Sequence, residues 1–255
     1  MIGMKYIIEE DVKEFIKRLP DLTLTPPTVH LIMAAIRSKK VKEFLGIKVH
    51  DLVIERKIIR PLEFWRDRYF NSVYNLALLQ HEGFYDLKDN KKVPSETVGL
   101  LATLSPRNVR FAVQDLIKDD IGFFYNNNEA SNAELAKQSS QWFSKLHQHR
   151  AKGSHFVTID IDSLDKELYT RVCDFISTIK IWMITETSGG YHIILDLTKE
   201  DDARTFYGQN GILQQLRQKE DPTIVEIQRD SQEPIPGTFY HRLNSIEPHF
   251  VKILR

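Results

Sequence analysis

Apolar residues recur along this chain with two different spacings, which divide it into two regions. In the first region, apolar positions three and four residues apart predict helices over residues 9–19, 28–45 and 63–82. One alternating segment, residues 53–59, predicts a strand. We therefore expect residues 1–95 to form a mainly helical N-terminal region.

From residue 98 onward the pattern alternates between strands and helices. A strand at 98–104 and helices at 109–118 and 133–147 predict an N-terminal α/β subdomain. The order from residue 156 is strand, helix, strand, strand, helix, strand: the strands begin near 156, 181, 191 and 224, and the helices cover 163–179 and 201–219. This order is typical of a split βαββαβ sheet with both helices on one face. The pattern thus predicts an α+β fold, with a palm-like split βαββαβ core in residues 96–255.

The composition of the chain excludes some kinds of site and partner. The 255 residues contain 35 Lys and Arg against 35 Asp and Glu, so no global basic field indicates a nucleic-acid partner. The densest basic stretch, residues 37–68, is interleaved with acidic residues and indicates a solvated surface of mixed charge. A single cysteine, Cys173, excludes a disulfide framework or a multi-cysteine zinc site within the chain.

The sequence also indicates where in the cell the protein is found. No apolar run approaches the ~20 residues needed to cross a bilayer, and the first residues do not form a secretory signal. We expect an intracellular protein, cytoplasmic or nuclear, that is not secreted and has no membrane partner.

Asp160 and Asp162 are the first candidate site residues. They follow the apolar run 156–159 at alternate positions, so in a strand both carboxylates point to the same face, about 6 to 7 Å apart. Two like charges so placed favour a cation between them, and a hard divalent ion such as Mg²⁺ or Mn²⁺ prefers oxygen ligands. A polar strand end that faces solvent and caps the next helix explains this tripeptide equally well.

Two further polar clusters fall on neighbouring strands of the predicted sheet. Ser188, Gly189 and Gly190 form a turn before His192, and glycines let backbone N–H groups approach an anion. Glu226 or Asp230, at the end of the last strand, could complete a set of three carboxylates. Each cluster alone is more often an ordinary turn or a surface strand end.

In their order and spacing, the three clusters resemble the archaeo-eukaryotic primase superfamily, the primase-polymerases. The matching motifs are Asp160-Ile161-Asp162, Gly190-Tyr191-His192, and Glu226 or Asp230 ahead of Pro236-Gly237-Thr238, with Thr103-Leu104-Ser105-Pro106-Arg107 upstream. The resemblance covers roughly residues 98–245.

The resemblance implies a metal-dependent nucleotidyltransferase that adds nucleotides to the 3′ end of a nucleic acid on a template. Its partners would be nucleoside triphosphates and single-stranded or primed nucleic acid. Asp160 and Asp162 would hold Mg²⁺ or Mn²⁺, with Glu226 or Asp230 as the third ligand. The phosphates would be held by His192, the backbone of Ser188, Gly189 and Gly190, and Arg107 or Arg242.

Some features depart from the family pattern and keep other classes open. Glu226 is one methylene longer than the usual Asp, and a single cysteine cannot build the family's zinc-binding element. The alternative is a relative with altered chemistry that binds nucleotides or nucleic acid as a processing factor. A glycosyltransferase needs a nucleotide-binding parallel βαβ region before its Asp-x-Asp, whereas residues 1–95 are expected to be mostly helical. A nuclease of the RNase H type has no role for the turn before His192.

Overall fold

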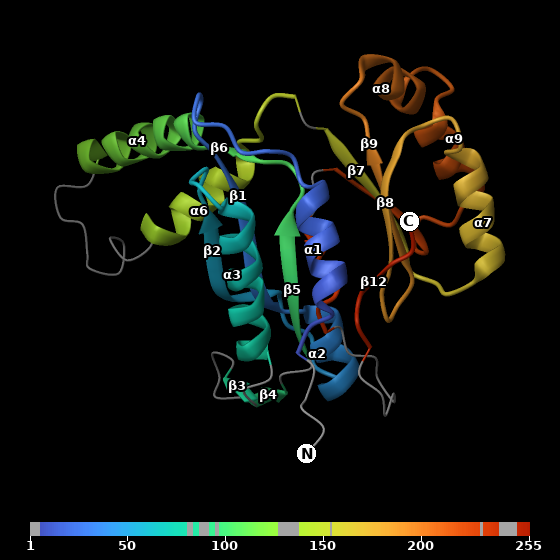
Figure 1. The fold of residues 1–255 in the computed structure, drawn as a ribbon, viewed down its shortest axis with the longest axis horizontal. Helices are drawn as coiled ribbons and strands as arrows, with labels where there is room; N and C mark the ends of the chain where they lie inside the picture. The colour runs from blue at the N-terminus through green and yellow to red at the C-terminus, as the bar shows by residue number, and fades with distance from the viewer. Residues whose placement is uncertain are drawn as a thin grey trace.

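The computed structural model describes residues 6–80, 84–86, 92–94, 97–126, 138–153, 155–229, 232–239 and 249–255. Within them the chain has a mixed α+β fold with two five-stranded antiparallel sheets (Figure 1) and a two-stranded ribbon of β3 (Phe84–Asp86) and β4 (Lys92–Pro94). No helix among these residues has both the length and the apolar character to cross a bilayer.

The first sheet combines segments from both ends of the chain. Its order is β11-β5-β1-β2, and β6 also pairs with β1. The strands are β1 (Thr28–Ile36), β2 (Leu52–Ile59), β5 (Val98–Thr103), β6 (Arg107–Asn108) and β11 (Gln232–Pro234). A boundary near residue 95 therefore passes through this sheet, because β1 and β2 precede it and β5 and β11 follow it.

Helices cover both faces of the first sheet. On one face, Ile32 and Ala34 of β1 pack with residues of α1 (Glu9–Arg18) and α3 (Trp65–Gln80). On the other face, Val29 and Leu31 pack with α4 (Val109–Asn126) and α6 (Gln138–Gln148). Every residue of β1 is buried as a result.

The prediction of a helix over residues 28–45 is wrong. The structure has the strand β1 followed by a short helix, α2 (Ser38–Leu45), which ends at Gly46 with φ 68°. A strand buried on both faces reads as a continuous apolar run, which periodicity alone does not separate from a buried helix. The N-terminal region is thus a mixture of strands and helices.

The second sheet has the order β10-β7-β9-β8-β12. Its strands are β7 (Phe156–Ile161), β8 (Ile181–Glu186), β9 (Tyr191–Asp196), β10 (Val225–Arg229) and β12 (Lys252–Ile253). Helix α7 (Lys166–Phe175) connects β7 to β8, and α8 (Glu200–Tyr207) and α9 (Ile212–Lys219) lie between β9 and β10 in the chain. The sequence predicted one helix over 201–219, but Asn210, with φ 60°, separates two.

The two faces of the second sheet have different partners. One face packs against α7, α8 and α9 in a core that includes Ile159 and Ile193. The opposite face contributes Phe156, Met183 and Ile194 to the core around α1. Figure 1 shows α1 between the two sheets, with α7 on the outer side of the second. Polar residues on this inner face therefore lie where the two sheets meet.

Candidate functional site

Asp160 lies on β7, which is the middle one of three adjacent strands of the second sheet, β10, β7 and β9. Its direct cross-strand neighbours are His192 on β9 and Glu226 on β10. His192 Nε2 is 3.5 Å from Asp160 Oδ1. Gln228 Nε2 donates hydrogen bonds to Asp160 Oδ2 at 3.4 Å and to Glu226 Oε2 at 3.2 Å. The structure thus brings together three of the residues that the sequence singled out.

The alternation of β7 explains why these side chains face inward. Val157, Ile159 and Ile161 are buried in the core that α7 and α9 complete. Because successive side chains of a strand point to opposite faces, Thr158 and Asp160 point to the inner face. The apolar positions of the strand therefore fix the direction of the carboxylate.

Glu233 belongs to this cluster, although no pattern in the sequence pointed to it. It lies on β11 of the first sheet, and its side chain is only 2% exposed. His192 Nδ1 is 2.8 Å from Glu233 Oε2, and Thr158 Oγ1 donates to Glu233 Oε1 at 2.5 Å. A carboxylate from one sheet therefore holds an imidazole of the other.

Burial and charge shift the pKa values of this cluster. Burial raises the pKa of Asp160 above the ordinary value for an aspartate; His192 opposes the rise, and the charges of Asp162 and Glu233 add to it. Burial alone would lower the pKa of His192, but the hydrogen bond and charge of Glu233, with the charges of Asp160 and Asp162, raise it above the ordinary value. A charged imidazolium between carboxylates is the state that these interactions favour.

Asp162 follows β7 directly, one residue past the strand's end at Ile161, and has a lysine beside it. Lys39 Nζ of α2 is 2.6 Å from Asp162 Oδ1, and both side chains are roughly half exposed, at 63% and 46%. The neighbouring Lys40, which is buried, donates to Ser188 Oγ at 3.1 Å. The basic stretch that we read as a solvated surface therefore contributes two ammonium groups to the candidate site.

The turn at 187–190 packs tightly against the end of β7. A Cβ on Gly190 would lie 1.7 Å from the carbonyl oxygen of Ile161, so no side chain fits there. Gly189 N–H already donates to Thr187 Oγ1 at 3.3 Å, and the Thr187 N–H donates to Gly190 O at 2.9 Å. The turn is thus held beside Asp162, but Gly189 N–H is not free to bind an anion.

The other expected site residues are not all placed at this cluster. Asp230 and Arg242 lie outside the described residues. Arg107 is only 1% exposed, and its Nη1 donates to the carbonyl oxygen of His147 at 2.9 Å. Its guanidinium is thus engaged in the core beside α6, rather than at the surface around Asp160.

A metal ion would need oxygen ligands that converge. Within the described residues, no group of three or more His, Cys, Asp or Glu side chains is arranged to hold one. Asp160 and Glu226 do fit part of such a site, because one amide group, that of Gln228, contacts both carboxylates. Asp162 lies beyond the end of β7, and its carboxylate is paired with the Lys39 ammonium.

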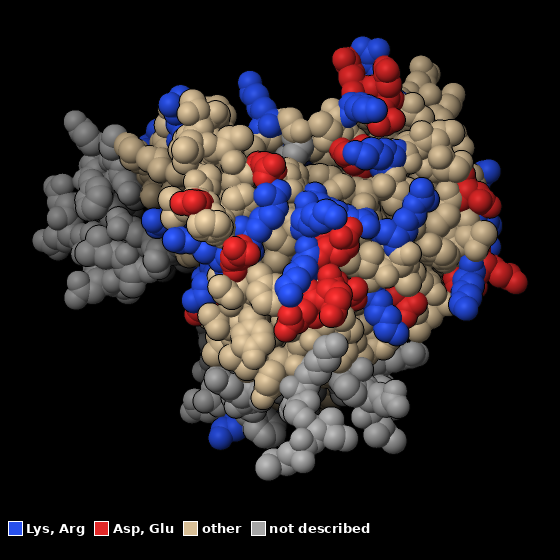
Figure 2. All heavy atoms as spheres, in the orientation of Figure 1, with Lys and Arg blue, Asp and Glu red and all other residues tan. Residues whose placement is uncertain are grey.

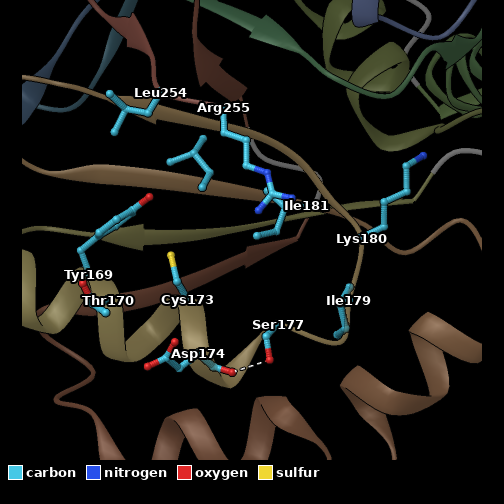
Figure 3. A pocket seen from close by; sticks show the side chains of 11 residues that line it. Tyr169, Thr170, Cys173, Asp174, Ser177, Ile179, Lys180, Ile181, Leu254 and Arg255 are labelled. Atoms are coloured by element: carbon cyan, nitrogen blue, oxygen red, sulfur yellow. Dashed lines mark hydrogen bonds between the residues drawn. The ribbon is translucent and has the colours of Figure 1, made fainter.

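Two other surface features lie apart from this cluster. A hollow of about 580 Å³ opens between α7 and β8, on the outer face of the second sheet, and is lined by Tyr169, Cys173 and Ile184 among others (Figure 3). The face shown in Figure 2 mixes Lys and Arg with Asp and Glu over its centre. On that face, the surface carries no broad field of one sign.

Comparisons of the chain with models of protein families, with curated proteins and with solved structures found no match. A function for this chain is therefore argued from the geometry of the cluster around Asp160 and from the resemblance of its motifs.

Proposed function

We propose that the chain is a metal-dependent nucleotidyltransferase of the primase-polymerase type, which adds nucleotides to the 3′ end of a nucleic acid on a template. The observation that carries the proposal is the position of Asp160, directly paired with His192 on one side and Glu226 on the other. Phosphoryl transfer depends on positioning and charge neutralisation rather than on a nucleophilic side chain. A row of acidic and basic groups on one face of a sheet suits that chemistry.

The connections of the second sheet support the proposal. If β7, β8, β9 and β10 are numbered one to four in chain order, their order across the sheet is four, one, three, two. Helices connect strand one to strand two and strand three to strand four. This order of strands and helices supports a split βαββαβ unit. We infer a palm-like core, with its helices on the outer face and its acidic residues on the inner face.

Each residue of the cluster has a part in this proposal. Asp160 and Glu226 would hold Mg²⁺ or Mn²⁺, joined by Asp162 once Lys39 moves away. Such an ion, when bound, would neutralise phosphate charge and make the phosphorus more electrophilic toward a 3′-hydroxyl. The imidazolium of His192 and the ammonium of Lys39 supply positive charge for a triphosphate. Single-stranded or primed nucleic acid is the expected partner.

A second candidate function is a nucleotide- or nucleic-acid-binding factor without catalysis. One observation favours it: Lys39 Nζ lies 2.6 Å from Asp162, where a polymerase of this type would place a metal. If that ion pair is permanent, Lys39 replaces the metal and the fold binds without reacting. The two candidates differ in whether the protein takes up a divalent ion.

The test combines metal binding with nucleotide incorporation. Wild-type protein with Mn²⁺, a primed template and labelled NTPs or dNTPs is expected to incorporate label. Asp160→Asn is expected to reduce incorporation at least about 100-fold, because it removes a charge from the metal site. Asp201→Asn, an exposed position on α8, is the control and is expected to leave the rate unchanged.

Uptake of Mn²⁺ by the wild-type protein separates the two candidates, and Lys39→Ala tests whether the ammonium competes with the metal. For a nucleotidyltransferase, the variant should bind Mn²⁺ more tightly in a calorimetric titration, because the competing ammonium is gone. Wild-type protein that binds triphosphates but neither takes up Mn²⁺ nor incorporates label would support the binding factor. Protein that binds neither triphosphate nor metal would contradict both.

A further inference from the structure

His192 and Glu233 form a pair that joins the two sheets, although the two residues are distant in the sequence. Glu233 is on β11, which pairs with β5 through Thr103 and Ala102 of the first sheet. His192 is on β9 of the second sheet, opposite Asp160. The ring therefore has a partner on each side: Glu233 at Nδ1, 2.8 Å away, and Asp160 at Nε2, 3.5 Å away.

The position of Glu233 is itself fixed. Its carboxylate is buried, and the Thr158 hydroxyl donates to the oxygen that does not contact His192. A buried carboxylate is costly unless its oxygens are hydrogen-bonded, so the two contacts stabilise one rotamer of Glu233. That rotamer in turn holds the proton on Nδ1 of His192, whether the ring is neutral or charged.

We propose that Glu233 is a positioning residue for His192: it orients the imidazole so that Nε2 is presented beside Asp160 to the phosphates of a bound nucleoside triphosphate. This rests on the proposed function for the identity of the ligand, but the orientation of the ring can be observed without any ligand. An acceptor behind one nitrogen of an imidazole fixes both the tautomer and the direction of the other nitrogen. The first sheet thereby contributes a residue to a site whose Asp160, His192 and Glu226 come from the second.

The first measurement is spectroscopic. In protein labelled with ¹⁵N-histidine, the His192 signal is identified by its loss in His192→Gln, and its nitrogen shifts are expected to report a proton on Nδ1. In the neutral ring, Glu233→Met removes the acceptor and should move the proton away from Nδ1, whereas Glu233→Gln retains an acceptor oxygen and should keep the proton there. Unchanged shifts in Glu233→Met would overturn the proposal.

The second measurement is ligand binding in the same variants. Glu233→Met is expected to weaken triphosphate binding about tenfold or more, and Glu233→Gln to recover part of the loss, since a charge-assisted hydrogen bond is the stronger kind. Binding of the unphosphorylated nucleoside should not change in Glu233→Met, whereas a general structural defect would weaken it as well. Gln232→Met, on the same strand but in contact with His147, is the control and should bind as wild type.

The outcomes distinguish this inference from the proposed function. If wild-type protein binds no triphosphate, the proposed function fails, while the ¹⁵N shifts still decide whether Glu233 orients His192. If the triphosphate binds equally well to wild type and Glu233→Met, the positioning role is wrong and the proposed function stands. Circular dichroism of each variant identifies any that fails to fold, and Glu233→Gln then supplies the comparison.

Discussion

At the scale of single residues, His30 has a buried imidazole, and protonation of this ring opposes folding. It is fully buried on β1, between the rings of Trp65 at 5.5 Å and Tyr69 at 6.1 Å, and its Nε2 is 2.9 Å from the carbonyl oxygen of Pro20. Burial lowers the pKa of His30 to about 4, although the hydrogen bond to Pro20 acts in the opposite direction. The folded protein therefore keeps this ring neutral over a range in which the unfolded chain protonates it.

We predict a loss of stability as the pH falls from about 6.5 to about 4. The unfolded chain binds a proton at His30 below pH ~6.5, while the folded chain does so only near pH 4, so acid favours the unfolded state. The contribution present above pH 6.5 amounts to about 3 kcal/mol, and it is lost across this window. Urea unfolding at several pH values should show a shallower decline for His30→Phe than for wild type.

The control for this prediction is the exposed residue His50. His50→Asn should follow the wild-type dependence on pH, since this side chain is exposed to solvent in the folded protein as it is in the unfolded chain. Equal slopes for wild type and His30→Phe between pH 6.5 and 4 would contradict the assignment.

The residues of the candidate site were predictable to different degrees. Asp160, His192 and Glu226 lie at corresponding positions of strands with clear alternation, so a correct order of strands was enough to bring them together. Glu233 comes from a strand of three residues that pairs with the other sheet, and local periodicity says nothing about such a distant pairing. The proximity of Lys39 to Asp162 was hidden for the same reason, because α2 precedes the second sheet by more than 100 residues.

At the scale of elements, the turn between β8 and β9 provides a second prediction. Gly190 lies against the backbone of β7, where a Cβ would be 1.7 Å from Ile161 O and 2.8 Å from Ser163 N. Gly190→Ala must therefore push the turn away from β7, and we expect a loss of about 2 to 3 kcal/mol in the free energy of unfolding. The measurement is urea unfolding followed by circular dichroism.

Gly189 gives this prediction a matched control in the same turn. A Cβ there would meet nothing within 4 Å, and the residue is exposed. Gly189→Ala should change the free energy of unfolding by no more than about 0.5 kcal/mol. Similar losses at both positions would mean that the turn is sensitive to any side chain rather than to contact with β7.

The elements also show where reasoning from sequence succeeds. The helices near 9–18 and 65–80 and the strands β7, β8, β9 and β10 were predicted from the spacing of their apolar residues and from the glycines and prolines near their ends. The strand β1 was not, since it is buried on both faces and shows no alternation. Its partners β2 and β5 lie about 20 and 65 residues away in the chain, so only the tertiary fold decides between strand and helix.

At the scale of the whole molecule, α1 connects the two sheets. Phe15 is completely buried and lies edge to face with Tyr69 of α3, at 6.4 Å, and with Trp182 of β8, at 6.1 Å. At the end of the same helix, Arg18 Nη1 donates to the carbonyl oxygen of Trp182 at 3.2 Å, and Trp182 Nε1 donates to the carbonyl oxygen of Arg18 at 3.3 Å. These contacts put both sheets into one core, so we expect them to unfold together.

The corresponding prediction is that Phe15→Ala lowers the stability of both sheets at once. Removal of a buried phenyl ring costs about 3 to 5 kcal/mol through lost burial and the cavity that remains. Urea unfolding followed by tryptophan fluorescence and by far-ultraviolet circular dichroism should give one transition with the same midpoint for both signals, shifted to lower urea. Leu24→Ala, at a side chain that is 70% exposed, should leave the midpoint near that of wild type. Midpoints that separate in Phe15→Ala would show that the sheets unfold independently, and a site built from Glu233 of one and His192 of the other would then depend on their docking.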